Sequence, residues 1–170
     1  FLRERIARPL LAEVHIGLPQ GAEPRVAEML APRLPPDLTL LTQPPEALMA
    51  LLSPQLHPEI PNQRAWRAAE IPAANAQASA HGIARIYAAL AQDGGLDGVR
   101  LCSRATLERA LQRQRGKTDL MLGFTDSWAM GWTCDQLGML GPSENTFGHG
   151  GWGGSLAMRH RSNCSWSCTH

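Results

Sequence analysis

Five glycines fall within seven residues near the end of the chain, in a segment that also carries one histidine. Residues 147–155 read FGHGGWGGS. Glycine lets the backbone come close to another group, so three interpretations fit: a phosphate cradle, a strand edge that offers an N–H to an oxyanion with His149 beside it, or a turn of structural meaning only. No helical pattern follows the glycines, so no helix N-terminus is available to hold an anion, and the cradle is the weakest interpretation.

Two other short stretches resemble catalytic motifs without completing them. Gly116-Lys117-Thr118 lacks the upstream glycine of a phosphate-binding loop, because Leu111 stands there, and it lacks the last glycine of a Lys-Thr-Gly triplet, because Asp119 follows. We interpret it as a solvated loop. Ser155 would need glycine at position 157 to form a nucleophile elbow, and that position is alanine, so we expect an ordinary strand residue.

The remaining histidines and cysteines give weak signals. The four cysteines form no C-x-x-C pair, so we interpret them as buried or incidental thiols. A metal site built by Cys164 and Cys168 with His160 or His170 is the alternative. His81 lies off the apolar stripe of a predicted helix, so we expect it at the surface.

That helix is the clearest element in the sequence. Apolar residues recur at 83, 86, 87 and 90, Asn75 is the expected N-cap, and the run DGG at 93–95 ends the pattern. Asp97-Gly98 then predicts a tight turn, and Ser103 is expected to cap a further helix that includes Leu111. Shorter helices are expected over 1–9, 45–52 and 63–69, within a region punctuated by prolines.

The second half has a different texture. The alternation of large and small residues from Trp128 to Trp132 predicts a strand, and the glycine segment follows later. Helices therefore come first and strands second, which is typical of an α+β fold. Sixteen basic residues are scattered along the 170-residue chain, and the net charge is +1. We therefore expect a soluble globular chain that binds no nucleic acid and contains no membrane span.

A set of stretches in a fixed order resembles the C-terminal half of serine hydrolases related to class C β-lactamases and penicillin-recognising esterases. The resemblance covers residues 1–157 and rests on FLRERIARPL at 1–10, VHIGLP at 14–19, RVA at 25–27, IPAAN at 71–75, ARIYAAL at 84–90, GG at 94–95, GVRL at 98–101 and FGHGG at 147–151. The last stretch resembles the third active-site motif of the family in its H-G-G form. The resemblance implies a β-lactamase/transpeptidase-like α+β fold, present here only in part.

The same resemblance implies hydrolysis of an ester or amide through an acyl-enzyme, with no metal and no organic cofactor. The family's Ser-x-x-Lys and Tyr-x-Asn motifs are absent from this sequence, so we expect no catalytic nucleophile in it and no activity of the chain alone. Four residues carry over: His149 would line the acyl site, Gly150 and Gly151 would let substrate approach, and the Trp152 N–H would form half of the oxyanion hole.

Both ends of the sequence suggest a piece of a longer protein. The chain begins with Phe1 inside a predicted helix, and residues 158–170 show no period and depart from the family pattern, so we interpret them as an aberrant or unrelated tail. The compartment stays open, with the cytoplasm only slightly favoured. A non-catalytic interaction protein or truncated gene product is the alternative to an enzyme fragment. An incomplete sheet would leave edges unpaired and would favour self-association of the fragment.

Overall fold

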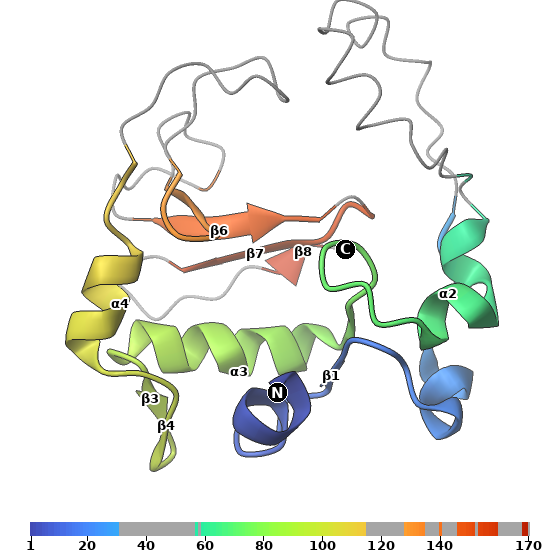
Figure 1. Ribbon diagram of the computed structural model, residues 1–170, viewed down its shortest axis with the longest axis horizontal. Coiled ribbons are helices and arrows are strands. Elements are labelled where there is room, and N and C mark those ends of the chain that lie inside the picture. The colour runs from blue at the N-terminus through green and yellow to red at the C-terminus, as the bar shows by residue number, and fades with distance from the viewer. Residues whose placement is uncertain are drawn as a thin grey trace, which may run out of the picture.

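The computed structural model describes the chain in several stretches. The described residues are 1–30, 57, 59–114, 128–134, 140, 146–151, 153–159 and 168–169. The helix expected over 45–52 lies outside them. Helix α3 runs beneath the strands β6 and β7, with α4 at one end and α2 on the other side of the molecule (Figure 1).

The N-terminal residues form a compact support for the central helix. The expected first helix is present as the π-helix η1 (Arg3–Ala7), whose register is set by a 2.9 Å bond from the Arg8 N–H to the Arg3 carbonyl. Strand β1 (Val14–His15) then pairs antiparallel with β2 (Gln77–Ala78). Along the chain between β1 and β2 come the 3₁₀-helices η2 (Gln20–Arg25) and η4 (Ile60–Asn62) and the helix α2 (Arg64–Ala68).

The central helix α3 (Ala80–Ala91) begins later than its sequence pattern predicts. Ser79 is the N-cap, because its hydroxyl accepts a 3.0 Å bond from the Gly82 N–H. The predicted cap, Asn75, is wrong: its side chain is buried and ties together a loop by accepting from Ile71 N–H and donating to the Trp66 and Ala69 carbonyls. Asn75 therefore stabilises the loop that precedes α3 and does not cap the helix.

The elements after α3 agree with the sequence. Strands β3 (Gly95–Leu96) and β4 (Val99–Arg100) form a hairpin whose turn residues, Asp97 and Gly98, have φ of 50° and 79°. Ser103 caps α4 (Arg104–Ala110), accepting a 3.1 Å bond from the Thr106 N–H.

The second half contributes a four-stranded antiparallel sheet in the order β5-β6-β7-β8. Its strands are β5 (Thr133–Cys134), β6 (Phe147–Gly150), β7 (Leu156–Arg159) and β8 (Cys168–Thr169). The strand predicted over Trp128–Trp132 is wrong. Residues 129–132 form a tight turn instead, with Gly131 at φ 82°, and Trp128 makes only isolated bridges. The alternation of large and small residues therefore does not indicate a strand in this segment.

The buried apolar side chains form two clusters. The first joins η1, β1 and α3 and includes Leu10 and Ala89, both fully buried. The second lies between α3, α4 and the sheet and includes Leu90, Leu107 and Phe147. Helices and antiparallel strands thus combine as the α+β prediction requires. Within the described ranges, no helix has the length and apolar character needed to cross a membrane.

Candidate active site

Strand β6 holds the glycine segment in the middle of the sheet. It pairs with β5 on one side, where Gly148 faces Thr133, and with β7 on the other, where His149 faces Ala157. Phe147 anchors the strand in the second apolar cluster: its ring lies 6.2 Å from that of Tyr87 and 5.5 Å from that of Trp132. Because the start of β6 is buried in this cluster, it fixes where the exposed end of the strand lies and in which direction it runs.

His149 lies on that exposed end. Its Nδ1 is hydrogen-bonded to the Gly150 carbonyl. A carbonyl oxygen only accepts a hydrogen bond, so the contact fits a ring proton on Nδ1. The ring is also tilted against Trp128, with 5.7 Å between centroids. Sequence reasoning missed Trp128 as a neighbour of His149, since it assigned Trp128 to a strand of its own.

The glycines of the segment serve different purposes. A Cβ at Gly148 would collide with the Ala157 carbonyl of β7 and would lie 2.9 Å from the Met158 Cα, so this glycine lets two strands pair. Gly150 and Gly151 are exposed. A Cβ at Gly150 would meet nothing closer than 3.9 Å, whereas one at Gly151 would overlap the Ser155 Oγ and lie 3.7 Å from the Ser155 carbonyl oxygen. The described residues therefore leave room for a side chain at Gly150, and at Gly151 only if the Ser155 side chain moves.

A turn connects β6 to β7. The Gly151 N–H donates to the Ser155 carbonyl at 2.7 Å, and the Gly154 N–H donates to the Gly151 carbonyl at 3.0 Å. Gly154 has φ 84°, so the turn requires glycine there. Ser155, expected in a strand, is exposed and lies one residue before β7 begins. Trp152 lies outside the described residues, as do Lys117 and Thr118.

The remaining predicted candidates lie apart from β6. His81 is exposed on α3, as expected. Cys102 is half-buried and Cys134 is buried, while the side chains of Cys164 and Cys168 lie outside the described residues. Over the described parts of the chain, no three His, Cys, Asp or Glu side chains gather closely enough to hold a metal ion.

The single tyrosine of the chain belongs to the packing beneath β6. Burial raises the pKa of Tyr87 to about 12, while a hydrogen bond from Trp132 acts in the opposite direction. The partly buried Tyr87 ring stacks on Phe147 and so supports the start of the strand.

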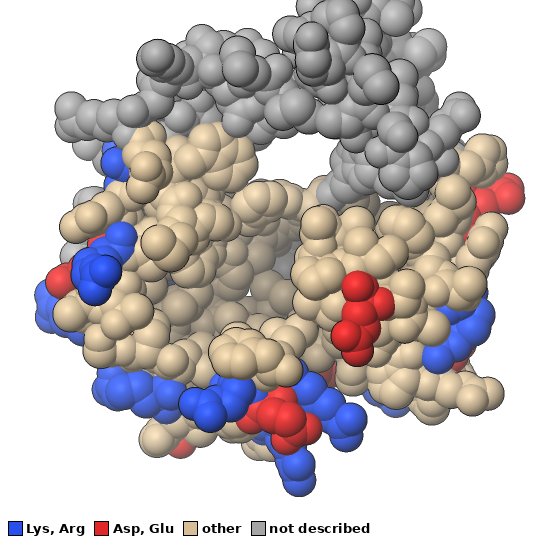
Figure 2. Space-filling model, in the orientation of Figure 1, with Lys and Arg blue, Asp and Glu red and all other residues tan. Residues whose placement is uncertain are grey.

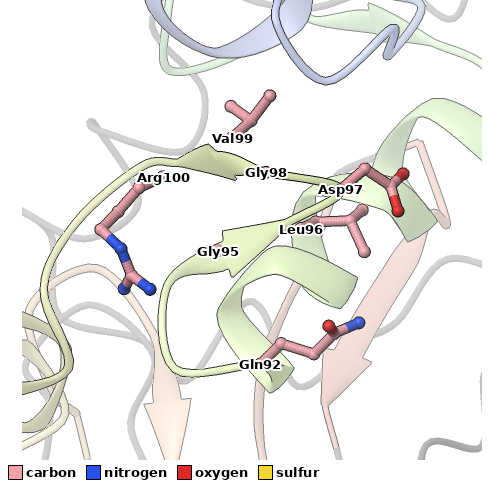
Figure 3. A pocket seen from close by; sticks show the side chains of 7 residues that line it. All are labelled: Gln92, Gly95, Leu96, Asp97, Gly98, Val99 and Arg100. Carbon is pink, nitrogen blue, oxygen red and sulfur yellow. The ribbon is translucent and has the colours of Figure 1, made fainter.

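A shallow pocket of about 260 Å³ lies away from β6, at the β3–β4 hairpin (Figure 3). Its charged side chains already have partners: Asp97 accepts a 2.6 Å bond from Arg85, and Arg100 donates to the Asp93 and Cys102 carbonyls. Asp97 and Arg100 point to opposite sides of the hairpin. The pocket therefore offers no converging set of groups for chemistry.

The space-filling view shows a hollow in the middle of one face, with the part of the molecule that contains α2 on its right-hand side (Figure 2). On this face the charged side chains lie mainly along the lower border and outer sides, with one acidic group on the right-hand rim of the hollow. The described surface that borders the hollow elsewhere is uncharged.

Comparison with known proteins gives this geometry a family. The family model described as Beta-lactamase matches residues 1–163. The esterase/beta-lactamase LipL of Mycobacterium tuberculosis (strain ATCC 25618 / H37Rv) is 33% identical over 168 residues, which cover 92% of this chain and 38% of that protein. The chain thus spans well under half the length of this relative.

Solved structures agree. A family VIII carboxylesterase superposes with a TM-score of 0.84 at 35% identity, covering 95% of this chain and 42% of its own. A penicillin-binding protein homologue from Caulobacter crescentus superposes with a TM-score of 0.82 at 34% identity, covering 96% and 43%. The predicted β-lactamase/transpeptidase-like α+β fold, present in part, is confirmed. The chain belongs to the beta-lactamase family.

Proposed function

We propose that this chain supplies the substrate-lining strand of a serine hydrolase that cleaves esters or amides through an acyl-enzyme. The observation that carries the proposal is the exposed end of β6, where the exposed Gly150 and Gly151 leave the backbone uncovered next to an exposed His149. An open backbone strip beside one polar group suits a substrate that lies against the strand. The names of the relatives, an esterase/beta-lactamase and a carboxylesterase, support the same reaction class.

The chemistry divides between this chain and a partner segment. A serine hydroxyl, activated by a neighbouring base, attacks the substrate carbonyl and forms a tetrahedral oxyanion. Neither Ser-x-x-Lys nor Tyr-x-Asn occurs in the sequence, so the nucleophile and its base must come from chain outside it. The Trp152 backbone N–H would donate to the oxyanion, and the second donor would be the N–H of the serine itself.

His149 has a positioning role in this scheme. The contact between its Nδ1 and the Gly150 carbonyl sets the orientation of the ring beside the glycine strip. A polar contact of this kind orients a substrate amide or hydroxyl but does not replace the backbone donor. The chain by itself is therefore expected to bind substrate weakly and to hydrolyse nothing.

A fusion tests the proposal. The N-terminal part of the M. tuberculosis relative, up to the start of the similarity, is joined to the complete 170-residue chain, and both the fusion and the chain alone are treated with a fluorophosphonate probe. Mass spectrometry should find one label on the fusion, at a serine of the N-terminal part, and none on the chain alone. Labelling of any serine of the isolated chain would refute the assignment of the nucleophile.

His149→Ala and His81→Ala form a matched pair in the fusion. Loss of one polar contact at the site should lower the acylation rate roughly 10- to 1000-fold for His149→Ala. His81 lies on the exposed side of α3, so its replacement should leave the rate within about twofold. A folded, active fusion that is equally insensitive to both changes would show that β6 is a structural strand only.

A further inference from the structure

Met29 reaches the turn that follows the glycine strip from a distant part of the sequence. A Cβ built on Gly153 would lie 2.5 Å from the Met29 Cε and 3.6 Å from its Sδ, so the thioether lies directly on the Gly153 backbone. A side chain at position 153 would therefore displace the Met29 methyl group. The contact joins two segments 124 positions apart in the numbering (153 minus 29).

The backbone of Met29 is held in place by a single side chain. The Asn62 Oδ1 accepts a 2.7 Å bond from the Met29 N–H, and the Asn62 Nδ2 donates a 2.9 Å bond to the Met29 carbonyl. An asparagine amide that satisfies both backbone groups of one residue fixes its position as a neighbouring strand would.

Asn62 is itself fixed by an ion-paired network. Arg67 is buried, donates 3.2 Å to the Asn62 Oδ1 and pairs at 2.7 Å with Glu23. The hydrogen bond from Arg67 holds the pKa of Glu23 below its usual value, opposed by the partial burial of the carboxylate and assisted by Arg64. The support behind Met29 is therefore charged and rigid, while Met29 itself is apolar.

The side chain of Met29 is available for a further contact. It is 38% exposed, and its neighbour Leu30 is 82% exposed, so two large apolar residues lie at the surface beside the turn. Methionine is unbranched and polarisable, and it adapts to irregular apolar partners. Most of the described surface around the central hollow also carries no charge (Figure 2).

We propose that Met29, positioned by Asn62 against Gly153, is a specificity-determining residue that contacts the apolar acyl chain of an ester substrate. This inference rests on the proposed function and narrows its substrate class to esters of carboxylic acids with several methylene groups. Glycine at 150 and 151 leaves the strip open to the reacting carbonyl, and the Met29 side chain covers the apolar chain that extends past the turn. Asn62 acts only through Met29.

The fusion described above gives the first test, with p-nitrophenyl acetate and octanoate as substrates. Met29→Ala should lower the octanoate-to-acetate ratio of kcat/KM by roughly 3- to 30-fold, because apolar contacts discriminate between chain lengths at about this level per small group. Acetate turnover should change less than about twofold. Asn62→Ala should lower the ratio in the same direction by a smaller factor, and Met130→Ala, which removes a 71% exposed methionine from another turn, should leave it unchanged.

The outcomes separate this inference from the proposed function. A fusion that is active and sensitive to His149→Ala, yet keeps its chain-length ratio in Met29→Ala, would overturn the role of Met29 and leave the proposed function intact. A folded fusion with no acylation would overturn the proposed function first. A test that needs no catalysis then decides the question of Met29.

That second test uses the 170-residue chain with ¹³C-labelled methionine methyl groups. Met29→Leu assigns the Met29 signal by its disappearance, and Met130→Leu assigns the control signal. Octanoate should shift the Met29 signal in a saturable manner, acetate should not, and the Met130 signal should stay in place. Equal responses of the two signals, or no response at Met29, would contradict the inference.

Discussion

The contact of α3 with the N-terminal residues and the exposed end of β6 both depend on glycine, but for opposite reasons. A Cβ at Gly82 of α3 would lie within 2.6 to 3.0 Å of the Glu13 backbone atoms, so glycine there allows two backbones to pack. At Gly151 a Cβ would overlap one side-chain atom, the Ser155 Oγ, and the nearest backbone atom, the Ser155 carbonyl oxygen, would lie 3.7 Å away. One glycine is required by the fold, and the other leaves a surface open.

The surroundings of the two regions follow the same division. Around α3 the chain fills space with side chains: Leu10 and Ala89 are fully buried, and Arg85 crosses from α3 to bond the Leu10 carbonyl. Along β6, burial stops after Gly148, and His149, Gly150 and Gly151 are exposed. Stability is thus concentrated under the sheet, and the groups proposed for function lie where packing ends. Changes in the first region should alter folding, and changes in the second should alter chemistry.

Gly82→Val should have the largest effect on folding. The new side chain cannot avoid the Glu13 backbone, so α3 and the N-terminal segment must separate, and we expect a loss of at least about 3 kcal/mol in the free energy of unfolding. Urea unfolding followed by tryptophan fluorescence measures it. The control is Gly21→Ala, where a Cβ meets nothing within 4 Å; equal stability of the two variants would contradict the close packing.

Two neighbouring leucines test the first apolar cluster. Leu10 is fully buried and Leu11 is 80% exposed. Leu10→Ala should cost about 2 to 5 kcal/mol, because it removes buried methyl groups and leaves a cavity. Leu11→Ala should change stability by less than about 0.5 kcal/mol. Similar losses from both changes, in the same unfolding assay, would show that the N-terminal residues do not pack as described.

The pH dependence of stability tests the packing beneath β6. Burial raises the pKa of folded Tyr87 to about 12, above the ordinary value of 10.0, so the folded state holds the phenol proton more tightly. The corresponding stability is present below pH 10 and is lost as the pH rises towards 12, by about 2 to 3 kcal/mol.

Tyr87→Phe should remove that part of the alkaline loss. Because Tyr87 is the single tyrosine, absorbance of the tyrosinate reports its titration directly. A midpoint near 10 in the folded chain would mean that water reaches the phenol and that the packing around Phe147 is loose.

The sequence predicted the parts of this molecule in which local chemistry decides the structure. Ser103 and the Asp97-Gly98 turn occur as expected, since a cap and a turn each depend on a few adjacent residues. The predictions for Asn75 and for the Trp128–Trp132 segment were wrong because the side chains of Asn75 and Trp128 make contacts that only the tertiary structure determines. Asn75 bonds backbone groups up to nine residues away, and Trp128 packs on His149.

The sequence singles out the glycine segment and His149, but not the side chains that surround them. The glycines and His149 were found through their density and through the resemblance to the H-G-G motif. Met29 and Asn62 gave no local signal, because a contact with Gly153 from so far along the chain follows from the fold alone. Long-range neighbours of this kind are beyond any reading of spacing.

Gly151→Val in the fusion tests the central claim most directly. Acylation by the fluorophosphonate probe, measured as a rate by mass spectrometry, should fall to background, because the branched side chain would occupy the strip along which substrate passes. The unfolding midpoint of the fusion should stay close to that of the parent, since only the Ser155 hydroxyl must move. Gly21→Val, at a glycine whose Cβ position is open, should leave both acylation and stability unchanged. A folded Gly151→Val fusion that is acylated at the parent rate would contradict the assignment of β6 as the substrate-lining strand.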